Sequence, residues 1–113
     1  MATSVEYIEY VCDQIKDLGF IRYKKMFGEY MVYVNDKPIL LICNNTVFIK
    51  KLEDVKLLMQ FSETGHPYEG AKEYYILDID NSELVESVIS ILEPITPIPH
   101  KKSKKKYNTL QGG

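Results

Sequence analysis

The sequence has few cysteines, which limits the kinds of site that it can build. Cys12 and Cys43 are the only two in 113 residues, and they form no Cys-x-x-Cys pair. This count and spacing disfavour a disulfide framework or a structural metal site. Cys12 falls on the apolar face of a predicted helix and Cys43 ends an apolar strand, so we expect two reduced, buried thiols.

Long hydrophobic runs are also missing. No stretch approaches the roughly 18 apolar residues that a membrane-spanning helix needs. The first ten residues, MATSVEYIEY, contain no basic region followed by an apolar run, which a secretory signal would show. We therefore expect a cytoplasmic protein with no membrane contact.

Histidine is equally scarce, and this argues against catalysis. His66 lies in a loop rich in glycine and proline, and His100 lies in the basic tail. Neither has a second metal ligand at helical spacing, and no nucleophile, base and orienting group come together in the sequence. The tripeptide Gly70-Ala71-Lys72 lacks the rest of a phosphate-binding loop. We expect no catalytic residues, no metal and no cofactor.

Acidic residues are absent from the last twenty positions, although the whole chain has a net charge of −2. Residues 1–93 contain all sixteen Asp and Glu but only nine Lys and Arg, a net charge of −7, and the last twenty residues contain five lysines. Such an acidic body disfavours binding to phosphate backbones. Only the tail has the charge that nucleic acid attracts.

The first helix is predicted from Val5 to Leu18. Thr3 and Glu6 fit a capping box, and Gly19 fits a left-handed C-terminal cap. Apolar residues recur along this segment at three- and four-residue spacing, which predicts one buried stripe made of Ile8, Val11, Cys12, Ile15 and Leu18.

Three strands joined by two tight turns are predicted from Met26 to Lys50, after a short extended segment at Arg22–Phe27. Polar turns fall at Asn35–Pro38 and at Asn44–Asn45. The five consecutive apolar residues Ile39–Cys43 predict a strand that is buried on both faces. Helices or another subunit must cover it, so we expect that a homodimer is possible.

A second helix is predicted from Glu53 to about Thr64, with an apolar face of Val55, Leu58, Met59 and Phe61. A strand at Tyr74–Leu77 and a last helix at Glu83–Leu92 follow, and Pro94 should end regular structure. The predicted fold is α+β, an antiparallel sheet flanked by helices. We expect one domain at residues 1–93, then a proline-containing linker and a disordered, lysine-rich tail at 94–113.

Two groups of residues are candidates for contact with a partner. Four surround the predicted strands and could contact a protein or an anion, namely Lys50, Tyr68, Lys72 and Tyr74. The alternatives are an exposed loop lysine at position 72, and at position 50 or 51 a lysine that reaches solvent or pairs with Glu29. The second group could contact nucleic acid and consists of Lys101, Lys102, Lys104, Lys105 and Lys106. The alternatives there are a solvated tail, an arm for anionic lipid or a nuclear-localisation-like patch.

Two separated motifs resemble the N-terminal domain of the TfoX/Sxy family. The first is MFGEY at 26–30, followed by Val32–Val34, Lys37–Pro38 and a strand that closes in Phe48-Ile49-Lys50. The second is PYEGAK at 67–72 before Tyr74-Tyr75. The resemblance covers about residues 5–92. It implies a fold shared with type III secretion chaperones, in the order helix, strands, helix, strand, helix, and a role in the transcription of bacterial competence genes.

The sequence departs from that family after the domain, because nothing in it resembles the helical C-terminal domain of full-length members. The resemblance provides no catalytic residues. We therefore expect a non-enzymatic regulatory module that binds a protein partner. The alternatives are a nucleic-acid-associated regulator acting through the lysine-rich tail, or a small-ligand binder or enzyme that uses the loop at 66–75.

Overall fold

Six antiparallel strands form one open sheet in the order β1-β2-β3-β4-β6-β5, with two α-helices packed on it. The computed structural model describes residues 3–26 and 28–99. The helices and strands are α1 (Val5–Gln14), β1 (Ile21–Met26), β2 (Glu29–Val34), β3 (Lys37–Cys43), β4 (Thr46–Ile49), β5 (Thr64–Gly65), β6 (Tyr74–Ile76) and α2 (Ser82–Ile95). Short 3-10 helices occupy η1 (Lys16–Leu18) and η2 (Glu53–Val55). The predicted α+β class with an antiparallel sheet is confirmed.

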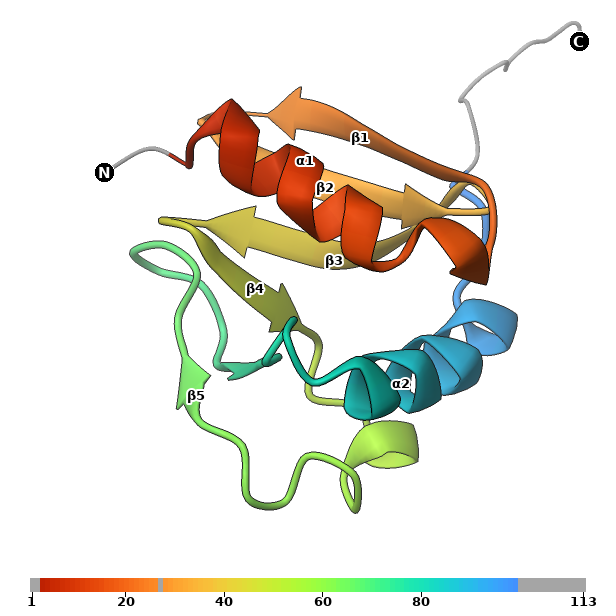
Figure 1. Cartoon of the computed structure of the whole chain (residues 1–113). Coiled ribbons are helices and arrows are strands. Elements are labelled where there is room, and N and C mark those ends of the chain that lie inside the picture. The colour runs from red at the N-terminus through yellow and green to blue at the C-terminus, as the bar shows by residue number, and fades with distance from the viewer. Residues whose placement is uncertain (1–2, 27, 100–113) are drawn as a thin grey trace, which may run out of the picture.

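Helix α1 lies across β1, β2 and β3 (Figure 1). It ends at Gln14 and is followed by η1, so the predicted helix to Leu18 is too long. The predicted capping box is also wrong, because Ser4 is the N-cap and its Oγ accepts a hydrogen bond from Tyr7 N (3.1 Å). Thr3 is instead buried and accepts from Asn45 N (3.2 Å), which ties the start of α1 to the β3–β4 turn.

Gly19 does not form the predicted left-handed helix cap. Its φ of 153° and ψ of −166° let the backbone pass close to the β2–β3 turn. A Cβ at this position would lie 3.0 Å from the side chains of both Asn35 and Val34. Gly19 is therefore needed for this close approach and for its positive φ.

The two hairpins of the central meander turn as predicted. Asn35, Asp36, Asn44 and Asn45 all have positive φ, between 52° and 67°. Two consecutive residues of this kind match the right-handed twist of the flanking strands, and asparagine and aspartate tolerate the conformation. The first turn needs only two residues, so β3 begins at Lys37, earlier than predicted.

Strand β3 is buried on both faces, as predicted. One face packs under α1 and α2, and its core includes Leu40, Ile42 and residues of β2 at positions 30, 32 and 34. On the other face, Leu41, Cys43 and Phe48 form a smaller cluster with the partly buried Met31, Tyr74 and Ile76. This burial is achieved within a single chain, so it does not itself require a second subunit.

A β-bulge allows a proline in this central strand. Pairing shifts between Val32, which lies opposite Leu40, and Tyr33, which lies opposite Pro38. A bulge leaves one residue without a ladder partner, here Ile39, and increases the local twist. Pro38 is tolerated because proline, which donates no hydrogen bond, occurs in sheets at such irregularities.

The helix predicted from Glu53 to Thr64 is wrong. Most backbone hydrogen bonds in this segment join residues three apart, whereas Met59 N donates to Val55 O (3.0 Å) with α-helical spacing. The chain must be extended from residue 63 because Ile76 N donates to Glu63 O (2.8 Å) and β5 pairs with β6. The segment before residue 63 therefore folds as η2 and a series of turns.

The last helix, α2, is longer than predicted and contains Pro94 in its final turn. Asn81 caps its start by accepting from Leu84 N (3.2 Å). Thr96 N and Oγ1 both donate to Leu92 O, at 3.0 and 2.6 Å, and this closes the helix two residues after the proline. Regular structure therefore ends after Ile95 and not at Pro94.

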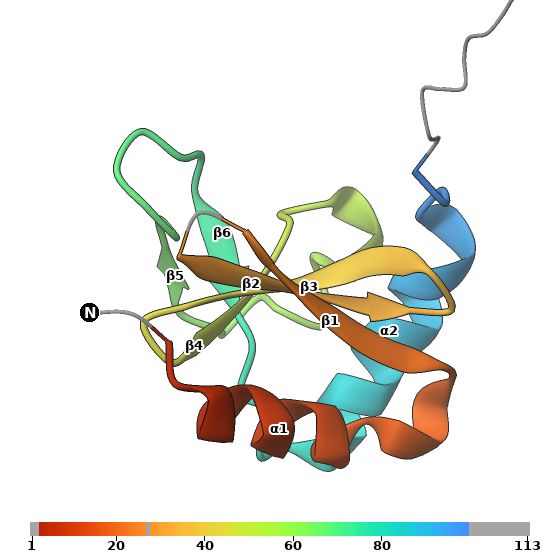
Figure 2. The same cartoon turned by 90° about the horizontal axis from the view of Figure 1, so that it is seen from above.

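Figure 2 shows α1 and the first turns of α2 on one side of the sheet, and the loop that joins β5 to β6 on the other. No helix in residues 3–26 and 28–99 has the length and apolar character needed to cross a membrane.

Candidate functional site

An apolar groove of about 340 Å³ lies on the sheet face opposite α1. Its floor is a row of paired side chains across three strands, in which Met31 lies opposite Leu41 and Leu41 lies opposite Phe48. Alternation along each strand puts these residues on one face because their neighbours point to the helix-covered core. Its size falls at the lower end of the range for ligand sites, roughly 300–1,000 Å³.

The end of α2 forms one wall of this groove. Ile95 lines it together with Thr96, Pro97 and Pro99, the residues that follow the helix. Proline side chains present rigid apolar surface and hold the backbone extended. Ile95 is 45% exposed and Thr96 is partly buried, so this wall faces both the groove and solvent.

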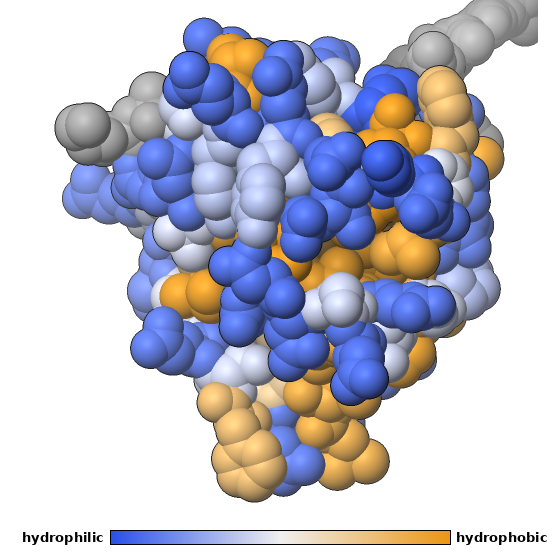
Figure 3. Space-filling model, in the orientation of Figure 1, coloured by the Kyte–Doolittle hydropathy of each residue, from blue (hydrophilic) through white to orange (hydrophobic). Residues whose placement is uncertain are grey.

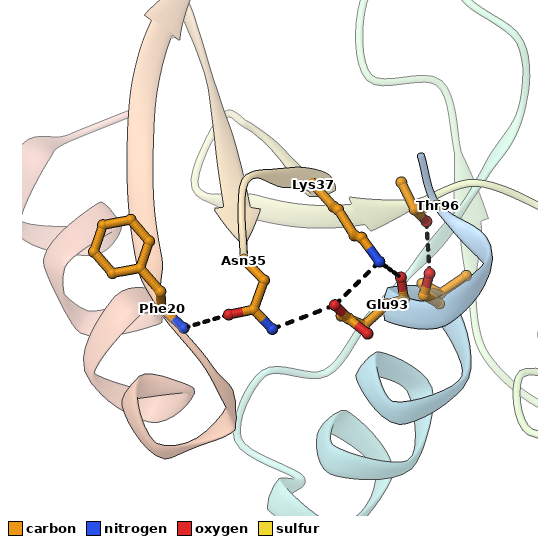
Figure 4. A network of polar contacts seen from close by, with 6 residues as sticks. Phe20, Asn35, Lys37, Glu93 and Thr96 are labelled. Atoms are coloured by element: carbon orange, nitrogen blue, oxygen red, sulfur yellow. Dashed lines mark hydrogen bonds and ion pairs between the residues drawn. The ribbon is translucent and has the colours of Figure 1, made fainter. Parts of the chain in front are cut away.

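Polar contacts hold the end of α2 against the β2–β3 turn (Figure 4). Lys37 Nζ donates to Glu93 O at 2.8 Å and lies 3.2 Å from Glu93 Oε2. Asn35 Nδ2 donates to the same carboxylate (3.3 Å), and Asn35 Oδ1 accepts from Phe20 N (2.9 Å). We call Lys37, Glu93 and Asn35 the latch. Through it, the position of the groove wall depends on the turn between two strands.

The electrostatics of the latch favour its charged form. Lys37 lies at the C-terminal end of α2, where a cation suits the helix dipole. Hydrogen bonds from Lys37 and then Asn35 to Glu93 lower the pKa of its carboxyl group. Glu93 therefore stays ionised, and the latch stays closed, to lower pH than an isolated carboxylate would allow.

Lys50 is the only charged residue among the described residues that line the groove. It follows β4 and is exposed, and within residues 3–26 and 28–99 no ion pair involves it. Tyr74 lines the groove as well, and its ring meets Phe48 edge to face, with centroids 6.4 Å apart. Burial, followed by the nearby Tyr68 and Cys43, raises the pKa of Tyr74, so its hydroxyl remains a neutral hydrogen-bond donor. The predicted candidates Lys50 and Tyr74 are thus brought together at one site.

The other two candidates of this group do not line the groove. Tyr68 is 48% exposed in the loop between β5 and β6, close enough to raise the pKa of Tyr74. Lys72 is exposed in the same loop. His66 braces that loop, because its Nδ1 lies 2.9 Å from Ala71 O. This contact gives the histidine a structural role.

The lysine next to Lys50 has a different environment. Lys51 Nζ lies 2.9 Å from Glu73 Oε1 and 5.4 Å from the centre of the Tyr75 ring. Glu73 also accepts from Thr64 Oγ1 (2.8 Å), and these contacts lower the pKa of its carboxyl group. The alternative in which Lys51 pairs with Glu29 is therefore wrong. The pairing instead joins β5 and β6 to the end of β4.

Neither thiol is a good nucleophile. Both cysteines are free, as expected, with Cys43 buried and Cys12 half-buried. Burial, followed by the nearby Glu29, raises the pKa of Cys43 to about 11. Since the thiolate is the reactive form, both residues are structural.

The remaining candidates, the five tail lysines at 101, 102, 104, 105 and 106, lie outside the described residues. The groove wall at Ile95–Pro99 and the latch were missed by sequence reasoning. Pro94 was interpreted as a stop signal, and nothing local shows that residues after it contact a sheet. Lys37 and Glu93 are 56 positions apart, so no local sequence pattern indicates that they form a pair.

The fold and groove define a small α+β protein with one antiparallel sheet and an apolar surface cleft. No known family model matches the chain. It is 30% identical over 107 residues to an uncharacterized 12.7 kDa protein in the trpE 5′ region of Spirochaeta aurantia, and the match covers 93% of each chain. The chain belongs to the same family as that protein.

Proposed function

We propose that this protein is a non-enzymatic regulatory module that binds other proteins through the groove. The observation that carries this proposal is an open apolar cleft with one cation, Lys50, at its side. Such a cleft fits an apolar side chain that is followed or preceded by a carboxylate on a partner. Its floor is supported by strand pairing and its wall by the latch, so the surface is preorganised.

The resemblance to the TfoX/Sxy N-terminal domain supports a regulatory role. The resemblance rests on the motif at 26–30 and on the loop at 67–72. This loop precedes the strand that carries Tyr74. We include in the proposal the chaperone-like relationship of the fold and a cytoplasmic location. Under this proposal, the protein acts by occupying a partner and not by chemistry.

The side chains that could carry out catalysis have other roles, which also supports a binding function. His66 braces its own loop through Ala71 O. The Cys43 thiol is buried and its pKa is raised to about 11. A nucleophile or a general base should instead have a pKa matched to its task.

Peptide selection tests the proposal directly. A display library of short peptides is selected on the wild-type protein and each binder is then measured against the double variant Lys50→Glu, Ile95→Glu, in which both changed side chains are at the groove and exposed. Lys72→Glu is the control for the Lys50→Glu change, because it makes the same charge reversal on an exposed lysine away from the groove. We expect the selected peptides to be enriched in apolar and acidic residues. They should bind the control as they bind the wild type, and should not bind the double variant. Binders that treat the two variants alike would show that the groove is not the docking surface.

A second candidate function is binding to nucleic acid through the tail, and the charge separation favours it. The last twenty residues carry five lysines and no acid. Deletion of residues 100–113 should then abolish DNA binding, and binding by the whole chain should weaken steeply with salt. Equal binding by the truncated chain would assign the activity to the domain instead.

A further inference from the structure

A hydrophobic projection stands out on the surface of the molecule. It is formed by Leu57, Leu58 and Phe61, in the segment between η2 and β5. Leu57 is 80% exposed and Phe61 is 94% exposed. Figure 3 shows a hydrophobic protrusion at the lower end of the molecule, where Figure 1 places this segment.

The folding of the chain does not require the projection. The same segment already anchors itself to the core through Val55 and Met59, both of which are fully buried. Leu57 and Phe61 point away from that anchor, and their exposure brings the fold no burial of apolar surface. Adjacent exposed apolar side chains of this kind mark a contact surface.

The projection and the groove match in size. The groove holds about 340 Å³, while a cavity of roughly 150 Å³ is enough to bind a benzene ring. One phenylalanine ring and one leucine side chain would therefore fill it. The two side chains are four residues apart, within a series of turns, and both are presented to solvent.

The charges of the projection segment and of the groove are also complementary. The segment from residue 53 to residue 63 contains three acids and one lysine. The groove carries Lys50, and Lys24 of β1 lies opposite Met31, one strand beyond its floor. Glu29 is on the same face of β2 as Met31, and its negative charge lies close enough to Cys43 to raise the pKa of that thiol.

We propose that the hydrophobic projection of one copy of this chain occupies the groove of a second copy. The inference rests on the proposed function, since it uses the groove as the docking surface. The contact is head to tail because each copy contributes a projection to one contact and a groove to the other. Self-association would thereby compete with partner binding at the same site.

Three variants separate this contact from other modes of association. Phe61→Asp removes the projection, and Phe20→Asp is its matched control because Phe20 is also exposed (62%) but lies at the start of β1. The double variant Lys50→Glu, Ile95→Glu disables the groove. Sedimentation velocity is measured from micromolar to millimolar concentrations for each chain, and for an equimolar mixture of the projection variant and the groove variant.

We expect the wild type and Phe20→Asp to associate reversibly, and each disabling variant alone to require a concentration higher by about tenfold or more. The mixture should form heterodimers, because one variant keeps an intact groove and the other an intact projection. A monomeric wild type at all concentrations would overturn the inference, as would a groove variant that associates like the wild type, or a mixture that stays monomeric. If groove-dependent peptides are still selected in that case, the proposed function survives the loss of this inference.

Discussion

Truncating a side chain should have different effects on stability on the two sides of the segment after η2: a large loss on the buried side and almost none on the exposed side. Met59 is fully buried and Phe61 is 94% exposed, although both belong to the apolar face that the sequence predicts. Truncating Met59 to alanine should cost about 3 kcal/mol, within the usual range for such a change in a core. Truncating Phe61 to alanine should change the free energy of unfolding by less than about 0.5 kcal/mol.

The larger effect has two sources. The side chain of Met59 fills part of the core, and its Sδ also lies 3.7 Å from Ser62 Oγ, which would lose this contact. For a domain of this size, a loss of about 3 kcal/mol lowers the melting temperature by roughly 15 °C. The Phe61 ring meets solvent before and after unfolding, so its removal alters little.

Urea denaturation followed by circular dichroism measures both variants. The protein should be kept at low micromolar concentration, because self-association would stabilise the folded state of the wild type. The slope with denaturant should be unchanged in each case. A loss below about 1 kcal/mol for Met59→Ala, or above about 1.5 kcal/mol for Phe61→Ala, would refute the assignment of inner and outer sides.

Three further changes test the latch, the thiol and the close approach at the β2–β3 turn. Lys37→Met should destabilise the protein at neutral pH. The difference from wild type should shrink as the pH falls through the lowered pKa of Glu93, since protonation removes the same interaction from the wild type; urea titrations at several pH values measure this. Cys43, whose pKa is about 11, should react with a thiol reagent at pH 8 only on unfolding, and fast modification of the native protein would contradict its burial. Gly19→Ala should cost about 1–3 kcal/mol because of its strained φ, and more if its Cβ displaces Asn35, whereas a neutral change would show that the turn can move.

Local patterns were sufficient to predict much of the fold. The alternation in β2, the asparagine-rich turns and the apolar run at 39–43 depend on neighbouring residues, so the meander could be predicted. The same holds for the stripe of α1. Errors came at helix ends, where Ser4 and not Thr3 caps α1, because a contact with Asn45 in a distant turn decides between two neighbouring hydroxyls.

The candidate site was only partly predictable. Lys50 and Tyr74 were identified, and strand pairing explains why they meet. Ile49 lies opposite Tyr75, and each candidate is the chain neighbour of one member of this pair. Lys72 is exposed in its loop, as in the alternative interpretation, and does not line the groove, because proximity in sequence does not determine which way a loop residue faces. Leu58 and Phe61 of the projection were interpreted as part of the apolar face of a helix.

The sequence by itself determined the class of the fold, the charge separation, the two hairpins and the double burial of β3, because each follows from residue type and spacing along a short stretch. Only the tertiary structure decided that residues 53–62 turn two apolar sides in opposite directions. It also decided that the chain after Pro94 forms a wall of the groove. Both depend on contacts that no local pattern specifies: β5 with β6, and Lys37 with Glu93. A local pattern records that a residue is apolar, but packing decides whether it meets the core, a groove or solvent.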